Sequence, residues 1–402
     1  MVEFNILNIL KKKSRIPHFH SALQVITEPS WSGRSYFSFA EEGYVKNVIA
    51  FRAIHMIATA VASIPLILNH ITNDGKSQIK SHPLLKLLNT PNPMLSKSEF
   101  IEGIVTYRLI SGNSYILMIE SQNSKNAVPK ELYLLRPDRV EIIPDKGNIP
   151  YIYRYKAGNS SYNFKVDKLT GRSSILHLKT FNPLNDLYGL SPIEAAAYSI
   201  DQHNQAGAWN QAMLQNGARP SGALIVQSAK DGSGGHLSSE QYMRLKEQIE
   251  SYYTGAKNVG RPILLEGGLD WKEMSLSPKD MDFIKSKNSS ARDIALAFGV
   301  PPQLLGIPGD NTYSNLIEAR LSLWEQTILP MLENIIGHFN SWLVPKFGND
   351  LCLSYDKDAI EILIEKRQKL WQYVQNASFM TLNEKREAFG LPKIPGGDVI
   401  DK

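Results

Sequence analysis

Three observations about the sequence predict an α+β fold with more than one module. With 402 residues, the chain is longer than one ordinary compact domain. Residues 41–190 mix short helical segments with strands, whereas residues 191–344 carry long helical segments. An apolar content of 43% and a charged content of 21% are those of a globular protein.

The first half of the chain is predicted to fold as an α+β module. Apolar residues recur at helical spacing over 40–62, and Ser63-Ile64-Pro65 ends that helix because proline disfavours a helical residue before it. The apolar run 53–68 is too short for a bilayer span and is predicted to be a buried helix that leads into a strand. Further elements are a helix at 82–89, a helix from Ser96 or Ser98 to 110, and strands at 64–68, 114–120, 131–135, 140–143, 151–155 and 175–178.

A long polar helix is predicted over 192–217. Ser191 can cap it, and Pro192 suits its first position. At 1.5 Å per residue it would span roughly 40 Å. A helix on a monomer core shows an apolar stripe, but this one is polar nearly all round. We therefore expect it to pack against copies of itself or to face a water-filled lumen.

The rest of the chain alternates strands and helices. Asn315 and Glu318 are predicted to form a capping box at the start of a helix. This helix runs to 344, with a kink at Pro330. Thr381 with Glu384 is a further capping box. The other predicted elements are a strand at 222–227, a flexible tip at 230–235, a helix from 238 or 239 to 253, a hairpin of 262–266 with 270–275, a helix at 280–298, a strand at 351–355 and a helix at 358–375.

Charge and cysteine content limit the function. The formal net charge is +5, of which residues 1–20 supply +3, so the remaining chain is close to neutral. A protein that grips phosphates tightly shows a broad basic face, whereas a conduit in which DNA slides does not need one. The single cysteine, Cys352, allows neither an intrachain disulfide nor a cysteine-based zinc site, and we expect a core thiol.

The N-terminal segment 1–40 is predicted to be a flexible basic tail. Its apolar run 4–10 precedes the basic residues 11–15, which is the reverse of a secretory signal. A short amphipathic start that touches a membrane is the alternative.

Motifs that carry chemistry are mostly absent. Asp74-Gly75-Lys76-Ser77 ends like a phosphate-binding loop, but position 70 is His70 instead of glycine, so the motif fails. Neither a dinucleotide fingerprint nor a nucleophile elbow occurs. His18-x-His20 has no neighbouring ligand type, and we expect no catalytic residue, metal or cofactor. Tyr151, Tyr153 and Tyr155 share one strand face, either as base-stacking groups or, as we favour, as a half-exposed face.

Short motifs stand in one collinear series over residues 45–400. They are SHPLL at 81–85 with PN at 91–92, SGNSY at 111–115, LRPDRV at 135–140, YGLSPI at 188–193, NGARPSG at 216–222, AFGVPP at 297–302, TYSN at 312–315, LNEKR at 382–386 and GGD at 396–398. Together they resemble the portal family of HK97-like tailed phages, prophages and gene-transfer particles.

This resemblance implies an architecture. The α+β module would be a wing, and two stem helices would flank an α/β clip. The implied division is a tail at 1–40, the wing at 41–190, stem helix 1 at 191–218, the clip at 219–277, stem helix 2 at 278–300, a tunnel loop and long helix at 301–344, and a mainly helical C-terminal wing or crown at 345–402.

The resemblance also implies a structural function without catalysis. Portal subunits form a ring, usually of twelve, at one capsid vertex, and double-stranded DNA enters and leaves through it. The implied partners are the major capsid protein or a scaffold, the large terminase that hydrolyses ATP, and the head–tail connector, with no membrane. The protein would be made in the host bacterial cytoplasm and reside in the virion.

On this template, site residues can be assigned. Lys285 and Arg292 lie seven residues apart and share a helix face, where they touch passing phosphates or form salt bridges between subunits. Gly309, Asp310 and Asn311 would form the channel constriction. The clip residues expected to dock partners are Lys230, Asp231, Lys257 and Arg261.

Two other classes of function remain open at this stage. One is an enzyme whose hydrolytic site is assembled by the fold. The other is a membrane-associated pore that uses residues 1–10 and 53–68.

Overall fold

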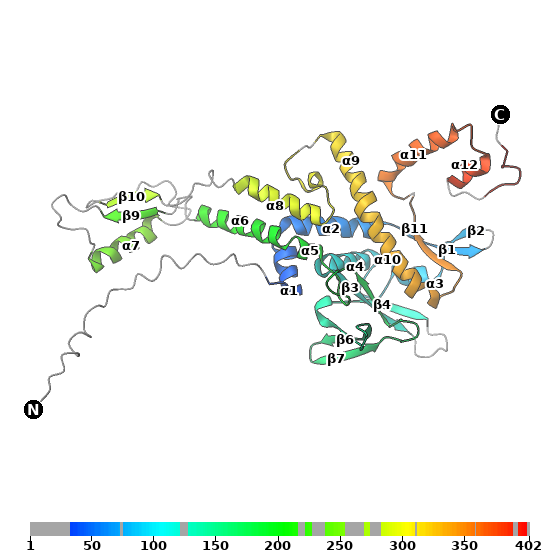
Figure 1. The fold of residues 1–402 in the computed structure, drawn as a ribbon, viewed down its shortest axis with the longest axis horizontal. Helices are drawn as coiled ribbons and strands as arrows, with labels where there is room; N and C mark the ends of the chain where they lie inside the picture. The colour runs from blue at the N-terminus through cyan, green and yellow to red at the C-terminus, as the bar shows by residue number, and fades with distance from the viewer. Residues whose placement is uncertain are drawn as a thin grey trace, which may run out of the picture.

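The computed structural model describes residues 33–72, 75–120, 128–215, 222–226, 238–253, 269–273, 283–309, 312–357, 359–388 and 393–399. It confirms the α+β class. A body of helices and sheets carries a projecting pair of helices, α6 and α8, at whose far end lie α7, β9 and β10 (Figure 1). The helices are α1 (Tyr36–Ser38), α2 (Val48–Ser63), α3 (Pro83–Asn89), α4 (Lys97–Ser111), α5 (Pro192–Ala195), α6 (Ala197–Gln215), α7 (Ser239–Tyr253), α8 (Phe283–Ala297), α9 (Tyr313–Leu323), α10 (Leu329–Trp342), α11 (Glu361–Gln375) and α12 (Leu382–Ala388).

Within the described residues, the body contains three sheets, each of three strands. Their orders are β11-β1-β2, β4-β3-β8 and β5-β6-β7, and all neighbours are antiparallel. The strands are β1 (Leu66–Thr72), β2 (Gly75–Ile79), β3 (Asn113–Glu120), β4 (Pro129–Leu135), β5 (Val140–Pro144), β6 (Pro150–Ala157), β7 (Ser160–Lys165), β8 (Ile175–Lys179) and β11 (Leu351–Tyr355), with β9 (Gly222–Val226) and β10 (Leu269–Glu273) paired outside the body.

The predicted helix over 40–62 is wrong as a single element. A π-helical segment, Phe39–Val45, meets α2 at a bend of 95°. Asn47 causes the break, because its side-chain oxygen accepts from the backbone N–H groups of Ile49 (3.1 Å) and Ala50 (3.0 Å) and so starts a new helix. The apolar spacing continues through this polar residue, which hid the break from a periodicity argument.

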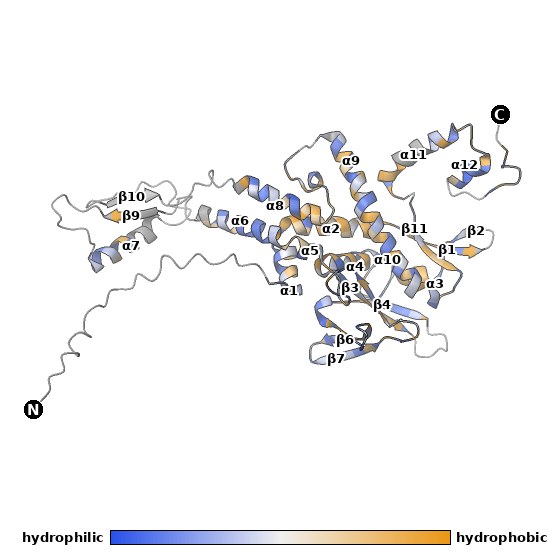
Figure 2. Ribbon diagram, viewed as in Figure 1, coloured by the Kyte–Doolittle hydropathy of each residue, from blue (hydrophilic) through white to orange (hydrophobic). Residues whose placement is uncertain are grey.

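Helix α2 is the centre of the core. Its buried face includes Ala53, Ile54, Ile57, Ala58 and Val61, each at most 1% exposed. This face packs on α4, α8 and α10, and in Figure 2 α2 is largely orange. Burial of each large aliphatic side chain contributes about 1.5–3 kcal/mol. Within the described residues, only this helix bent together with Tyr36–Val45 reaches the length and apolarity of a membrane span, and no single helix does.

Several boundaries follow the predicted caps, and others do not. Ser96 and Glu99 form the capping box of α4, and Thr381 with Glu384 forms that of α12. The helix after the loop at 306 is capped by Thr312, whose hydroxyl accepts from the Asn315 N–H, so the predicted box of Asn315 with Glu318 is wrong.

The kink predicted at Pro330 takes the form of a π-helical turn, Trp324–Ile328, between α9 and α10. Pro330 therefore stands in the first turn of α10, where its missing N–H is not needed.

Two strands of the described residues were missed. Strand β7 is mostly exposed and polar, and β2 is similarly short of apolar residues, so neither shows the alternation that marks a strand. Strand β10 pairs with β9, and the predicted pairing with 262–266 lies outside the described residues. The core-thiol expectation was also wrong, because Cys352 on the sheet strand β11 is only partly buried.

Two glycines join the body to the projecting helices. Gly112 follows α4 in the left-handed region (φ 74°), and Gly189 stands three residues before α5. A Cβ built on Gly189 would lie 2.1 Å from the Gly112 carbonyl oxygen and 2.7 Å from the Thr180 nitrogen. Only glycine permits this contact between backbones.

The side chains around the glycine contact fix it further. Ser191, which caps α5, donates to the carbonyl oxygens of Leu109 (2.9 Å) and Ile110 (2.7 Å). The Asn113 side-chain oxygen accepts from the Gly189 N–H at 2.7 Å. Together these bonds attach the start of the helix pair to the end of α4.

Substitution of Gly189 tests this joint. Gly189→Ala is expected to lower the free energy of unfolding by about 2–3 kcal/mol, because backbone atoms on both sides cannot move away from a Cβ. Gly337→Ala is the matched control, because its Cβ would meet nothing within 4 Å. Alanine at this exposed helix position should raise the free energy of unfolding by about 1 kcal/mol. Urea denaturation at fixed protein concentration measures both, and equal effects of the two substitutions would contradict the joint.

His177 lies against the same joint. Its Nε2 donates to the Asn113 oxygen at 2.9 Å, since the Asn113 amide nitrogen is already occupied as a donor to the Ser111 carbonyl. The ring stacks on Tyr115 with centroids 4.4 Å apart. Burial, followed by the positive charges of Lys179 and His338, lowers the pKa of His177 to about 3.

Stability should therefore depend on pH through His177. Below pH 6.5 the His177 ring takes up a proton in the unfolded chain, whereas in the folded chain it stays neutral down to about pH 3. The free energy of unfolding therefore falls as the pH falls, by up to about 1.4 kcal/mol per pH unit. In His177→Gln this contribution is absent, so the stability difference from wild type should shrink between pH 7.5 and 5 in urea denaturation. A difference that stays constant over this range would show that His177 is protonated normally.

Candidate functional site

The candidate site is the projecting pair of helices α6 and α8. They run antiparallel and side by side, and connect the body to β9, α7 and β10 (Figure 1). Hydrogen bonds between polar side chains join the two helices: Ser290 Oγ donates to Gln202 Oε1 at 3.3 Å, and Ser199 Oγ donates to Asp293 Oδ2 at 3.5 Å.

Burial along this pair falls off with distance from the body. Near the body, Ile200 of α6 and Ile294 of α8 are 2% and 0% exposed. Away from it, residues 210–212 of α6 and 284–287 of α8 are exposed. Figure 2 shows α6 as blue over much of its length. The outer half of the pair therefore presents polar surface that one copy of the chain does not cover, as the polar sequence of 192–217 predicted.

A buried polar cluster holds the base of the pair. Asn47 is 0% exposed and donates from its amide nitrogen to Asn204 Oδ1 at 2.9 Å and to His203 Nδ1 at 3.3 Å. Since the Asn47 oxygen caps α2, His203 Nδ1 must act as the acceptor and is unprotonated. Burial, and then the charge of Lys287, lower the pKa of His203. Beside the cluster a cavity of about 500 Å³ is lined by Glu42, Lys46, His203, Gln211 and Lys287, among others.

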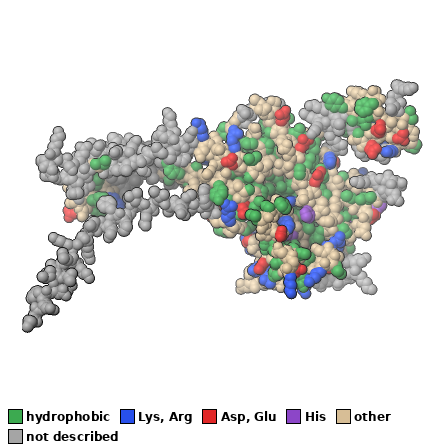
Figure 3. All heavy atoms as spheres, viewed as in Figure 1, with side chains coloured by type: hydrophobic (Ala, Val, Ile, Leu, Met, Phe, Trp, Pro, Cys, Tyr) green, Lys and Arg blue, Asp and Glu red, His purple; other side chains and the backbone are tan. Residues whose placement is uncertain are grey.

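Of the residues predicted to line the channel, the structure brings Arg292 and Gly309 into contact. Lys285 and Arg292 are both exposed on α8, where Figure 3 shows Lys and Arg side chains. Arg292 donates to the Pro308 carbonyl oxygen, and its guanidinium lies directly over Gly309. Arg292 and Gly309 thus meet, with Arg292 holding the loop that carries Gly309. Asp310 and Asn311 lie outside the described residues.

The predicted docking residues, Lys230, Asp231, Lys257 and Arg261, all lie outside the described residues. Of the segment 219–277, the structure describes α7, β9 and β10, and β9 pairs with β10 in an antiparallel ladder from Gly222↔Glu273 to Val226↔Leu269.

Catalytic and metal-binding arrangements are not found in the described part of the chain. No three His, Cys, Asp or Glu side chains gather there as a metal site would need. Two histidines contact carboxylates, His55 with Glu102 at 3.4 Å and His70 with Asp350. Neither described ring is hydrogen-bonded to a Ser, Thr or Cys side chain, so the hydrolytic arrangement lacks its nucleophile there.

The three tyrosines of β6 share a strand face that the body covers in part. Tyr153 is 8% exposed, and its ring meets that of Tyr115 at 6.3 Å. Tyr151 and Tyr155 are partly buried. The half-exposed strand face that the alternation favoured is confirmed.

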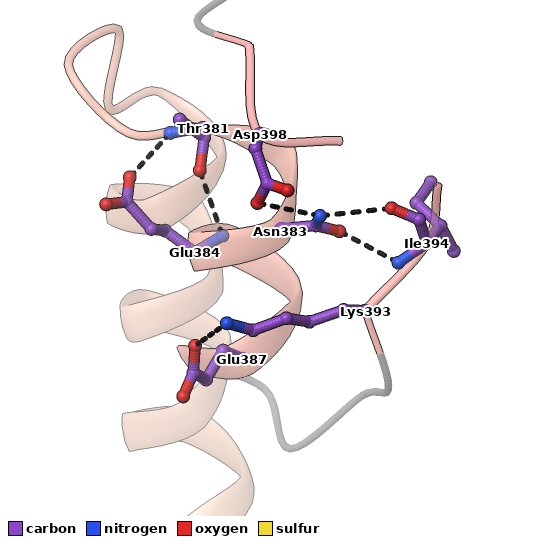
Figure 4. A network of polar contacts seen from close by, with 7 residues as sticks. All are labelled: Thr381, Asn383, Glu384, Glu387, Lys393, Ile394 and Asp398. Carbon is purple, nitrogen blue, oxygen red and sulfur yellow. Dashed lines mark hydrogen bonds and ion pairs between the residues drawn. The ribbon is translucent and has the colours of Figure 1, made fainter. Parts of the chain in front are cut away.

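The sequence motifs turn out to be joints between distant segments, a role that the sequence did not reveal. Asn92 donates to the Leu132 carbonyl oxygen at 2.8 Å and accepts from the backbone of Met94 and Leu95. Figure 4 shows a second joint, in which Asn383 of α12 exchanges two hydrogen bonds with the Ile394 backbone and donates to Asp398 at 2.9 Å. Asparagine suits both places because it donates and accepts at once.

The fold and the motifs agree with comparisons to known proteins. Residues 49–390 match the family model of the phage portal protein. An uncharacterized protein of Rickettsia bellii is 47% identical over 89% of this chain and 90% of its own length. The portal protein of Enterobacteria phage HK97 is 25% identical over 90% of this chain and 82% of its own length. A chain in the neck of a native gene transfer agent particle, computed with C12 symmetry, superposes with a TM-score of 0.67 at 40% identity, over 91% of this chain and 96% of that chain. This chain therefore belongs to the phage portal protein family, in its HK97-like group, whose members are structural proteins and not enzymes.

Proposed function

We propose that twelve copies of this chain form a ring at one capsid vertex, and that double-stranded DNA passes through its axial channel. As a portal subunit the chain is a structural component of a particle. The neck that contains the 40% identical chain was computed with C12 symmetry, which supports the number twelve.

The observation that carries this proposal is the polar projecting pair α6–α8. The outer half of this pair presents mainly polar side chains, so it would gain little from packing on a monomer core. In a ring, the same polar surface contacts neighbouring copies or faces a water-filled channel. Head-to-tail contacts between identical subunits close into a ring when the rotation between neighbours fits.

Each segment of the chain has a proposed role in such a ring. The helix pair, within 191–218 and 278–300, is the stem, and 219–277 is the clip that docks the large terminase and later the head–tail connector. The part of the body formed by 41–190 is the wing, which meets the major capsid protein or scaffold. Residues 301–344 hold the tunnel loop, and 345–402 form the C-terminal wing or crown. The ring is assembled from subunits made in the bacterial cytoplasm.

Within the channel, we assign different tasks to the two basic residues of α8. Lys285 is exposed and would contact passing phosphates weakly. Arg292 is instead a positioning residue, because its guanidinium binds the Pro308 carbonyl and covers Gly309. Asp310 and Asn311 complete the proposed constriction, and Lys230, Asp231, Lys257 and Arg261 the proposed docking surface of the clip.

Imaging of the purified full-length protein tests the ring. Negative-stain micrographs and mass measurement should show twelve-subunit rings with an axial hole wide enough for a duplex. A uniform monomer or dimer at high protein concentration and in several salts would contradict self-assembly of the chain alone.

Hydrogen exchange tests the task assigned to Arg292. Arg292→Ala should increase exchange at the amides of Gly306, Ile307 and Gly309 by about tenfold, since the loop loses its side-chain bond and samples open states more often. Lys285→Ala, on the same helix face, is the control and should leave these amides unchanged. If both variants protect the loop as well as wild type does, Arg292 does not position it.

A further inference from the structure

A second cavity, of about 650 Å³, lies in the body beside the β5-β6-β7 sheet. Met118 and Glu120 of β3, Tyr151 of β6, the segment 165–174 that follows β7, and the C-terminal end of α10 with Lys346 line it. Trp342 forms part of the lining and is 5% exposed. A volume of this size is within the range of pockets that bind small molecules or short peptide segments.

The segment 165–174 is held in place from both sides. The Val166 N–H donates to the Tyr151 carbonyl at 2.9 Å, and the Trp342 indole N–H donates to the Ser173 carbonyl at 2.8 Å. The Met118 N–H donates to the Ser174 carbonyl at 2.8 Å. The cavity wall is therefore tied to β6, β3 and α10 and is preorganised for a ligand.

Cations outnumber available anions in this cavity. It is lined by Lys165, Lys168, Arg172 and Lys346 against Glu120 and Asp167. Glu120 lies 2.8 Å from the Lys346 ammonium and neutralises it.

Asp167 is directed into its own loop. It accepts from the Leu169 N–H at 2.9 Å and from the Thr170 hydroxyl at 3.0 Å, and these bonds lower its pKa. Among the described residues, no carboxylate forms an ion pair with the side chains of Lys165, Lys168 or Arg172. Within the part of the chain that the structure describes, these three positive charges are therefore available to an anionic ligand.

The surroundings of the cavity are basic as well. Residues 128–179 contain ten Lys and Arg against five Asp and Glu, while the rest of the chain contains 34 of each kind. This segment therefore has an excess charge of +5, and the +3 of residues 1–20 is cancelled by an acidic excess in the other segments. Figure 3 shows its Lys and Arg side chains along the lower edge of the body, below β6 and β7 in the view of Figure 1.

We propose that this cavity, which we name the basic wing cleft (Lys165, Lys168, Arg172, Met118 and Trp342), binds an acidic segment of a partner protein. Carboxylates of that segment would meet the three cations, and a neighbouring apolar side chain would rest on Met118 and Trp342. Lys168 is already oriented, with its ammonium 5.0 Å from the Tyr151 ring centre. Such electrostatic complementarity selects a partner and speeds its association.

Duplex DNA fits this cleft less well than an acidic peptide. A duplex presents a continuous convex row of phosphates, which a cavity of about 650 Å³ cannot admit. A peptide can instead place single carboxylates beside Lys165, Lys168 and Arg172. This site goes beyond the channel function and does not depend on it.

Peptide binding to the full-length protein tests the cleft. The probe is the fluorescein-labelled peptide Gly-Glu-Glu-Asp-Glu-Glu-Gly, followed by anisotropy at low and at high salt. Lys165→Glu with Arg172→Glu should weaken binding at least about tenfold, because two attractive charges become repulsive. The matched control is Lys130→Glu with Lys146→Glu: both lysines are exposed in the same basic segment but outside the cleft, and we expect less than a roughly threefold change.

Three outcomes would overturn the proposal. The first is equal loss in the two double variants, which means that the general field of the segment attracts the peptide. The second is absence of peptide binding to a wild-type protein that circular dichroism shows to be folded. The third comes from a 12-base-pair duplex run in parallel: if the cleft variant loses duplex binding and keeps peptide binding, the ligand is a nucleic acid.

Discussion

The contact between the backbones of Gly112 and Gly189 is the constraint on which the rest of the structure depends. It places the start of α5 against the end of α4, and so fixes where the helix pair leaves the body. Asn113, Ser191 and His177 add hydrogen bonds on the same spot. A ring of identical subunits requires each pair of helices to project at one angle, and a joint made of backbone atoms is stiffer than one made of side chains.

The helix pair also illustrates how polarity can be structural. Its outer half is exposed in a single chain, and its internal contacts are hydrogen bonds between small polar side chains. Polar side chains of this kind can form hydrogen bonds with water, with neighbouring copies and with passing phosphates. The near-neutral charge outside residues 128–179 fits a channel that lets DNA slide, because strong phosphate contacts would oppose movement.

The motifs of the sequence have a shared physical role. Asn92, Asn113 and Asn383 each bind backbone groups of a segment far along the chain or across a loop. Gly112 and Gly189 permit a backbone approach that any Cβ would block. These residues hold the frame in place, while Lys285 and Arg292, which we assign to the channel, lie on exposed positions of α8, whose identity the frame does not dictate.

The sequence by itself determined the α+β class, most helices and strands, the caps at Ser191 and Thr381, and the polar character of the α6 segment. These features depend on local periodicity and on hydrogen bonds between near neighbours in the chain. Only the tertiary structure decided which distant segments meet: β11 with β1, Asn47 with His203, and Arg292 with the loop at Gly309. It also decided that the basic charge of 128–179 surrounds a cleft, because a sequence gives the number of charges but not which of them share a cavity or neutralise one another.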